Sequence, residues 1–357
     1  MRIAIRRRHI PLAATALVLA LVYAAAAMKF PGFFSLRVLV DFFKDNAFVG
    51  VAAIGMTFVI LSGGIDLSVG AVIGFTSILI ATLVRDHSVH PLGAIALAML
   101  FGSALGAVMG CLIHFQKLPP FLVTLAGMFF ARGLGFLVSG ESIGIKHPFY
   151  SRLMDVGLPL PGSATVPLTA LVFLAVFAAG VYLAHFTKFG RTVYAIGGNE
   201  PSALLMGLAV GRTKILLYTL NGFCASLAGV VFSLYAQAGN PTWGIGTELD
   251  AIAAVVIGGT LLSGGVGYVA GTLMGVLILG VIQTAIAFQG NLNTWWTKIA
   301  VGVLLLVFIL LQNLVSRVST RGGGSTQRPP STQRTAEDWG TARRNVERNG
   351  KTAHRHG

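Results

Sequence analysis

Charge is scarce in this sequence. Only 11% of its 357 residues are Asp, Glu, Lys or Arg, whereas hydrophobic residues make up 55%. A water-soluble domain carries charge on about a quarter of its residues. This chain therefore has too little charge to cover a soluble surface, and the scarcity indicates an integral membrane protein.

Motifs for enzymatic chemistry are also missing. The phosphate-binding pattern G-x-x-x-x-G-K-[ST] does not occur, so any ATP used by this protein binds to another chain. A G-x-G-x-x-A pattern lies in GGVGYVA (264–270), but it stands between apolar spans, without a strand–helix–strand unit around it. The two cysteines, Cys111 and Cys224, fall within apolar spans and predict no disulfide. His114 and His185 have a spacing unsuited to a metal site. We therefore expect no enzyme, no cofactor and no metal.

Apolar sequence is abundant. A helix of roughly 20 apolar residues crosses a hydrocarbon core about 30 Å thick. The runs are continuous rather than alternating, which favours helices over a barrel. We predict an all-α membrane protein with about ten transmembrane helices. The expected spans are 10–28, 47–62, 67–84, 92–115, 120–139, 164–185, 214–236, 249–262, 268–289 and 297–315.

The distribution of basic residues predicts the orientation. Ten spans place both termini on one side, and most of the Lys and Arg residues fall on that side. Positive loops stay in the cytoplasm, so both termini are expected there. The net charge of +14 thus reflects topology and does not indicate nucleic-acid binding. The basic residues on this side are Arg2, Arg6, Arg7, Arg8, Lys117, Lys188, Arg191, Arg212, Lys214 and those after residue 315.

These features divide the chain into three parts. Residues 1–9 form a basic N-terminus, 10–315 the transmembrane domain, and 316–357 a basic tail. The start resembles a signal peptide, but nine further spans follow, which favours an uncleaved first helix. The tail is rich in Gly, Ser, Thr, Gln, Pro and Arg. It is predicted to be disordered and to contact anionic membrane lipid.

The longest cytoplasmic loop, 186–213, contains the signals of a short helix. Asn199 suits the N-cap, Glu200 suits the positive end of the helix dipole, and Gly207 suits a left-handed C-terminus. The expected helix has about two turns and is too short to be stable alone. It must therefore pack either on the membrane surface or on a cytoplasmic partner. Its exposed side chains would be Leu204, Leu205 and Met206.

Four stretches resemble the permease subunits of ribose-type bacterial ABC sugar importers. VYAIGGNEPSALLMGL (193–208) resembles the cytoplasmic coupling loop of that family. The other three are DNAFVGVAAIGMTFVILSGGIDLSVG (45–70), PPFLVTLAGMFFARGLGFLVS (119–139) and ELDAIAAVVIGGTLLSGGVG (248–267). The resemblance covers about residues 10–315, and the tail departs from it.

Two shorter stretches give a finer resemblance. ESIGIKHPFY (141–150) and NTWWTKIAVG (293–302) are similar to the permease of the bacterial galactofuranose importer. Ala71 stands where many members of the wider family have Ser, a change that leaves the motif around it intact.

The resemblance implies a multi-pass subunit of the bacterial inner membrane that imports a monosaccharide, with galactofuranose as the specific expectation. Its implied partners are a second permease subunit, identical or different, ATP-binding subunits that hydrolyse ATP, and a periplasmic sugar-binding protein. The family's coupling loop maps onto Gly197, Gly198, Asn199, Glu200 and Gly207, with Leu204 and Leu205 as exposed contacts.

The run GGIDLSVG (63–70) places a carboxylate within apolar sequence. A charge at mid-bilayer costs roughly 2.5–3.5 kcal/mol on insertion scales, so Asp66 must face protein or water. Gly63 and Gly64 break the helix. If a helix restarts near Leu67, Asp66 or Ser68 can cap its free amides. Direct contact with the sugar is the alternative role. A proton-coupled secondary transporter using Asp66 is the alternative function, although it leaves the short cytoplasmic helix unexplained.

A second broken segment resembles the first. Residues 50–70 align with 251–271, and each copy contains LSGG. Paired broken helices can mark a transport site, whereas Gly-rich membrane sequences also match by chance. In the predicted topology both copies run in the same direction, which does not suit an inverted repeat. The candidate pathway or helix-break residues are Ser62, Gly63, Gly64, Asp66, Ser68, Ser263, Gly264 and Gly265.

The remaining candidates lie mostly towards the opposite side. Trp243, Glu248 and Asp250 precede an apolar span and are expected either to meet sugar hydroxyls or to anchor the rim. Arg132 lies in an apolar helix and is expected to snorkel or to pair with Glu141. Small residues at 102, 106 and 110 predict close helix packing.

Overall fold

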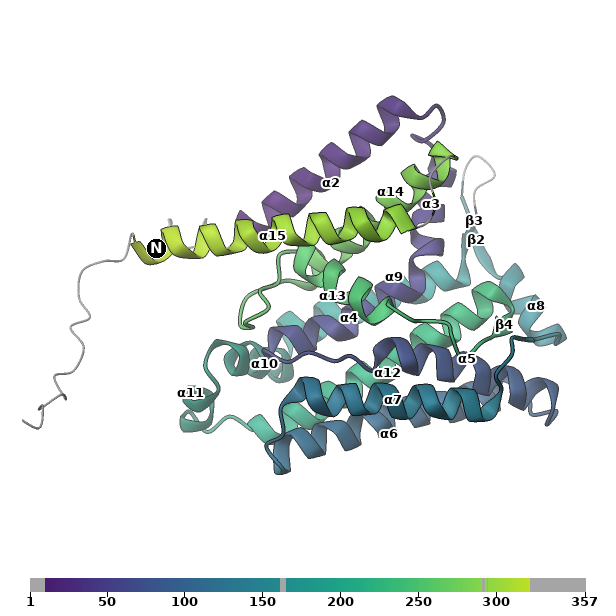
Figure 1. Ribbon diagram of the computed structural model, residues 1–357, viewed down its shortest axis with the longest axis horizontal. Helices are drawn as coiled ribbons and strands as arrows, with labels where there is room; N and C mark the ends of the chain where they lie inside the picture. The colour runs from purple at the N-terminus through teal and green to yellow at the C-terminus, as the bar shows by residue number, and fades with distance from the viewer. Residues whose placement is uncertain (1–9, 161–164, 291–292, 294, 322–357) are drawn as a thin grey trace, which may run out of the picture. The chain divides into compact units, whose positions relative to one another are not determined.

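The computed structural model describes residues 10–160, 165–290, 293 and 295–321 (Figure 1). The chain divides into two compact units, Met1–Gln312 and Asn313–Gly357. All elements discussed below belong to the first unit, except the end of the last helix. The expected basic N-terminus and nearly all of the expected tail lie outside the described residues.

The described residues are mainly helical, as expected from the continuous apolar runs. The helices are α2 (Ile10–Lys29), α3 (Leu36–Asp45), α4 (Ala47–Leu61), α5 (Val69–Arg85), α6 (Pro91–Phe115), α7 (Pro120–Val138), α8 (Pro148–Asp155), α9 (Leu168–Phe186), α10 (Lys188–Gly198), α11 (Glu200–Leu205), α12 (Val210–Ala236), α13 (Thr247–Ile257), α14 (Val269–Gln289) and α15 (Trp295–Arg321).

Two small sheets complete the described structure. Strand β1 (Ile143–Gly144) pairs antiparallel with β4 (Ala238–Gly239), and β2 (Gly157–Pro159) pairs antiparallel with β3 (Thr165–Pro167). The β2–β3 hairpin and α8 lie at one end of the first unit, whereas α10 and α11 lie at the other end (Figure 1).

Each expected span has a helix at its position. Six described helices, α2, α6, α7, α9, α12 and α14, are long and apolar enough to cross a membrane. The pair α3 and α4, bent by 58°, makes a seventh candidate, and α5 and the start of α15 are shorter apolar helices. The expected helix over 249–262 was too long, because α13 ends at Ile257 in a glycine-rich stretch. The protein is therefore a helical, integral membrane protein, and the count of ten spans stays a prediction.

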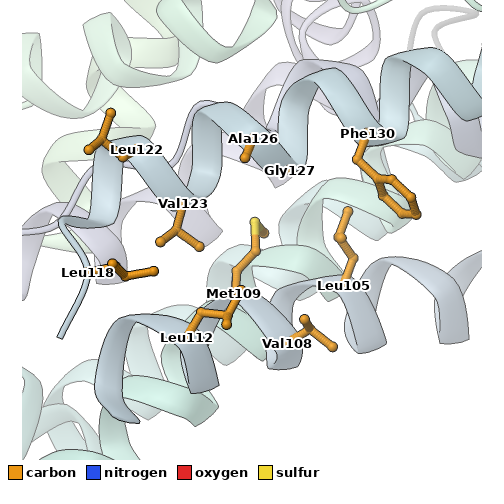
Figure 2. Close-up of a pocket in the computed structure, with 10 residues that line it drawn as sticks. All are labelled: Leu105, Val108, Met109, Leu112, Leu118, Leu122, Val123, Ala126, Gly127 and Phe130. Atoms are coloured by element: carbon orange, nitrogen blue, oxygen red, sulfur yellow. The ribbon is translucent and has the colours of Figure 1, made fainter. Parts of the chain in front are cut away.

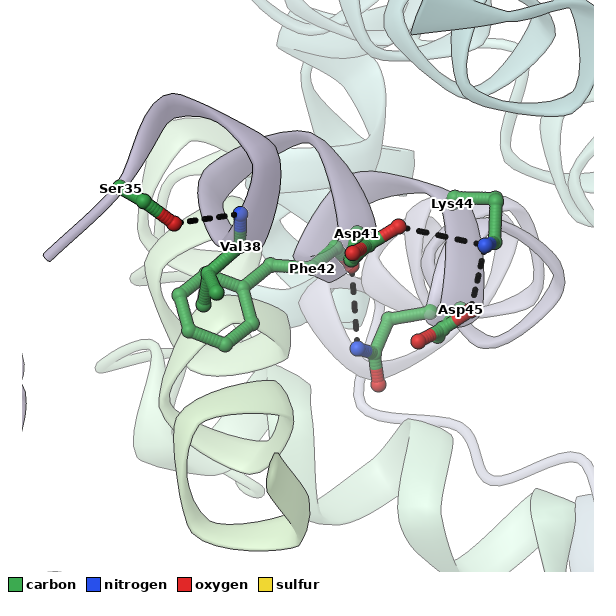
Figure 3. A network of polar contacts seen from close by, with 7 residues as sticks. Ser35, Val38, Asp41, Phe42, Lys44 and Asp45 are labelled. Atoms are coloured by element: carbon green, nitrogen blue, oxygen red, sulfur yellow. Dashed lines mark hydrogen bonds and ion pairs between the residues drawn. The ribbon is translucent and has the colours of Figure 1, made fainter. Parts of the chain in front are cut away.

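Helices α3, α8 and α10 were not expected from the sequence. The start of α3 follows an ordinary N-cap, since Ser35 Oγ accepts a hydrogen bond from Val38 N at 3.3 Å. Its polar face carries the ion pairs of Lys44 with Asp41 (3.2 Å) and Asp45 (3.7 Å), shown in Figure 3. The charges interrupt the apolar run, so the sequence pattern did not indicate this amphipathic helix, in which Val40 and Phe42 are buried.

The core centres on α12, which packs against α4, α5 and α6. Glycines on α6 allow the closest approach. A Cβ added at Gly106 would overlap the carbonyl oxygen of Tyr218, and one added at Gly102 would lie 2.7 Å from the carbonyl oxygen of Gly222. The close packing expected at 102, 106 and 110 is confirmed, and α12 is consequently fixed as a central scaffold.

Candidate functional site

The short helix expected after residue 199 is α11 (Glu200–Leu205). Asn199 Oδ1 accepts a hydrogen bond from Ser202 N at 2.8 Å, which caps the N-terminus. Gly207 has φ +74°, and the amides of Gly207 and Leu208 donate to the carbonyls of Leu204 (2.9 Å) and Ala203 (3.1 Å). This pattern is a Schellman motif. The cap and the glycine terminus are therefore confirmed.

The outer face of α11 is apolar and uncovered. Leu204, Leu205 and Met206 are 54%, 90% and 68% exposed. The inner face is anchored, since Ala203 is buried in a small cluster with Ile196 and Val210. Leu204 and Leu205 belong to this six-residue helix and Met206 is its C-cap, and together they form either a docking element or a membrane-surface element.

Glu200 contributes more than the expected dipole interaction. Its Oε1 lies 2.6 Å from Nζ of Lys214, a residue of α12. The ion pair connects the start of α11 to the central helix. This ion pair was not expected from the sequence, because the two residues are separated by a turn whose geometry only the fold defines.

The first helix break follows α4. Gly63 has φ +82°, and a non-helical segment leads to α5, which begins at Val69. Asp66 is fully buried, and its Oδ1 accepts hydrogen bonds from Ser68 N (2.8 Å) and Ser68 Oγ (2.6 Å). Asn221 Nδ2 of α12 donates to Asp66 Oδ2 at 2.7 Å.

Asp66 therefore accepts from the amide of Ser68, the residue immediately before α5, and bonds to no amide of α5 itself, so its expected capping role is met only at the residue that precedes the helix. Ser68 is the N-cap residue by position, but its side chain makes no capping bond. The expectation that Ser68 itself caps the helix was wrong, because its hydroxyl is engaged by Asp66. No part of Asp66 is exposed to a ligand in this conformation.

The second break meets the first. Gly264 and Gly265 have φ values of +84° and +76°, and Gly265 N donates to the carbonyl oxygen of Leu61 at 2.8 Å. A Cβ added at Gly264 would lie 2.7 Å from Gly63 N. The two LSGG stretches are thus neighbours in space. Ser62 Oγ donates to the carbonyl of Val59 at 2.8 Å, and Ser263 is exposed.

The segment before α13 is held by Arg132 of α7. Arg132 Nη1 donates to the carbonyl oxygens of Pro241 and Trp243, the latter at 2.8 Å. The ring of Trp243 packs edge-on against Phe232, with centroids 4.7 Å apart. The expected pairing of Arg132 with Glu141 was wrong, because the arginine is directed to backbone carbonyls that the fold brings beside it.

The two acidic candidates differ in their surroundings. Asp250 forms an ion pair with Lys298 of α15, with Oδ2 and Nζ 2.6 Å apart. Glu248 Oε1 accepts from Gly246 N at 3.2 Å, whereas its Oε2 is buried without a hydrogen-bond partner among the described residues. Of the three proposed sugar contacts, Glu248 alone therefore keeps a free acceptor oxygen.

An apolar groove of about 390 Å³ lies between α6 and α7 (Figure 2). Its walls include Leu105, Met109, Val123 and Phe130, and all ten lining residues are apolar. A sugar needs hydrogen-bonding groups, so this groove does not suit a polar solute. Within the described residues no group of three or more His, Cys, Asp or Glu side chains forms a potential metal site.

Comparison with known proteins defines the family. The family described as branched-chain amino acid transport system / permease component matches residues 38–309, which include both breaks, α10 and α11. The chain belongs to this permease family. No solved structure matches it. As a member with several apolar helices, it is a multi-pass protein of the bacterial inner membrane.

Three relatives are similar over most of their length. The inner membrane ABC transporter permease protein YjfF of Escherichia coli K12 is 54% identical over 306 residues, covering 86% of this chain and 92% of the relative. The ribose import permease protein RbsC of the same strain is 37% identical, covering 79% and 88%. The fructose import permease protein FruG of Bifidobacterium longum is 34% identical, covering 87% and 93%.

Proposed function

We propose that this chain is the membrane-spanning subunit of an ABC importer that moves a monosaccharide into the cell. The proposal is supported by two relatives named as ribose and fructose import permeases. Each alignment covers most of this chain and most of the relative. ATP hydrolysis then belongs to a partner chain, since this sequence has no phosphate-binding loop.

The observation that carries the proposal is the exposed face of α11. Leu205 is 90% exposed on a helix whose two ends are capped and whose inner face is anchored by Ala203. A helix this short is not stable by itself, so its rigid presentation is a property of the fold. An apolar socket on an ATP-binding subunit would bury Leu204, Leu205 and Met206, and burial of a Leu side chain contributes about 1.5–3 kcal/mol.

The proposed transporter also has a defined topology, a set of partners and a specific sugar. We propose ten spans within 10–315, both termini in the cytoplasm, and the loop 186–213 as the ATPase-coupling loop. A second permease subunit, two ATP-binding subunits and a periplasmic sugar-binding protein complete the transporter. Galactofuranose is the specific sugar we propose, because 141–150 and 293–302 resemble the permease that imports it.

The test is a Leu205→Asp substitution in this chain, which carries an affinity tag and is purified as a detergent-solubilised complex. A carboxylate in an apolar socket is strongly unfavourable without a partner. We expect loss of the ATP-binding subunit from the affinity-purified chain. Leu158→Asp introduces the same charge at a 54% exposed leucine of β2, at the opposite end, and should retain the subunit. Equal retention by the two variants would reject the docking role of α11.

A further inference from the structure

Three backbone segments meet at one point next to α11. They are the end of α4, the glycine stretch after α13 and the end of α10. Gly265 N donates to the carbonyl oxygen of Leu61, and a Cβ added at Gly264 would lie 3.0 Å from the Cα of Gly197. A Cβ added at Gly197 would overlap both the carbonyl oxygen of Leu61 and the amide nitrogen of Gly265. These segments therefore pack backbone against backbone.

A side chain of α10 reinforces this contact. The hydroxyl of Tyr194 donates to the carbonyl oxygen of Gly267 at 2.8 Å, just before α14 begins. Deeper in the core, Thr57 of α4 and Thr272 of α14 share a hydrogen bond of 2.8 Å. The last turn of α10 thus contacts both helix breaks, and the helices that flank those breaks contact each other.

The connection from this point to α11 is short and rigid. Asn199 alone separates α10 from α11, and its side chain caps α11. The Glu200–Lys214 ion pair and the buried Ala203 fix α11 further. Close-packed elements move together because they have little free volume between them. We therefore expect a displacement of α11 to move the end of α10, where Gly197 lies.

We propose that Gly197 and Tyr194 are positioning residues of a coupling junction, defined as the contact of α10 with Leu61, Gly265 and Gly267. Through it, movement imposed on α11 by an ATP-binding subunit shifts both helix breaks together. The inference rests on the proposed function, because it requires that subunit to dock on α11. It names the residues that transmit the movement of α11, and it identifies the two LSGG stretches as the segments that this movement displaces.

The requirement for glycine at 197 is one of space. Gly197 does not have a positive φ, so alanine is compatible with its backbone conformation. Only the added methyl group conflicts with the neighbours. At Gly198, the next residue of the same helix, an added Cβ has nothing within 4 Å. At Gly133, an exposed glycine of α7, the same holds. Gly197 and Gly133 therefore allow the same methyl group to be added with and without a steric conflict.

The experiment uses the full complex in proteoliposomes, with a fluorescent bimane label at Ser263→Cys in a background with Cys111→Ala and Cys224→Ala. The emission is compared without nucleotide and with ATP plus vanadate, so the readout needs no sugar. Overpacking against the carbonyl oxygen of Leu61 is expected to separate α10 from the two breaks, and so to lower the nucleotide-dependent change in emission about tenfold. We expect this loss in Gly197→Ala and no change in Gly133→Ala. Gly197→Ala should still retain the ATP-binding subunit, unlike Leu205→Asp.

Equal responses from Gly197→Ala and Gly133→Ala would overturn the coupling junction while leaving the proposed function intact. Absence of any nucleotide response in the unsubstituted complex would overturn both.

If Gly197→Ala is not recovered from membranes, Tyr194→Phe replaces it, since it removes only the hydroxyl that donates to Gly267. Tyr194→Phe should reduce the response several-fold. Tyr182→Phe, at a 62% exposed tyrosine of α9, should not. Matching responses of these two variants would also overturn the inference.

Discussion

Asn221 of α12 donates its side-chain amide to Asp66 at 2.7 Å, which ties the first helix break to the central helix of the core. The two residues are separated by 155 positions in the sequence. With Ser68 bound to the other oxygen, both carboxylate oxygens of Asp66 are engaged. This arrangement allows a buried carboxylate in apolar surroundings because its hydrogen-bonding capacity is used.

Asp66→Asn should keep much of the sugar uptake. The new amide oxygen can still accept from Ser68, and Asn221 can turn its amide so that Oδ1, which has no partner among the described residues, accepts instead. Asp66→Leu should fail, because it leaves the Ser68 amide and Asn221 unpaired at about 1–3 kcal/mol each. Uptake and thermal stability are measured at matched expression. If Asp66→Asn is as inactive as Asp66→Leu although it folds, a proton-carrying Asp66 and a secondary transporter become the better account.

Arg132→Met should destabilise the segment before α13. The substitution removes the donor to the carbonyls of Pro241 and Trp243, with an expected loss of about 1–3 kcal/mol in unfolding free energy. Thermal melting of the purified chain in detergent measures it. Glu141→Gln is the control, since Arg132 does not contact Glu141, and it should leave the melting temperature unchanged. A comparable drop in both variants would contradict the arrangement at Arg132.

The sequence predicted those parts of the site whose contacts lie within a few residues of each other, and it missed the contacts between distant helices. The ends of α11 were predicted correctly because Asn199 and Gly207 act on backbone groups within a few residues. The break at Gly63 is likewise a local property. In contrast, the contact of Asn221 with Asp66 and that of Gly197 with Leu61 arise only when distant helices pack. No local pattern encodes them.

The errors have the same origin. Glu141 was one of two expectations for Arg132, beside snorkelling, because it is a nearby opposite charge in the sequence, whereas the partners of Arg132 are carbonyls about 110 residues away along the chain. Asp250 was considered for sugar binding, and its partner Lys298 lies on another helix. Helix α3 was overlooked because a search for apolar runs misses an amphipathic helix with Asp41, Lys44 and Asp45 on one face.

The proposed orientation predicts opposite accessibility for the two ends of the first unit. Ser151→Cys on α8 should react with a membrane-impermeant maleimide in intact spheroplasts, and Ser202→Cys on α11 should react only after lysis. Both serines are exposed, and the background lacks Cys111 and Cys224. An odd number of spans between α8 and α11 produces this difference. Labelling of both cysteines from the same side would contradict the topology.

The proposed function makes this chain a passive pathway driven by an ATPase docked on α11. The most direct measurement is uptake of radiolabelled galactose, ribose and fructose by proteoliposomes containing the chain, with and without its co-purified partners. We predict that one of these sugars accumulates only when the ATP-binding subunits, the sugar-binding protein and ATP are all present, and that Leu205→Asp abolishes the accumulation. Accumulation driven by a proton gradient in vesicles that contain this chain without an ATP-binding subunit would contradict the account.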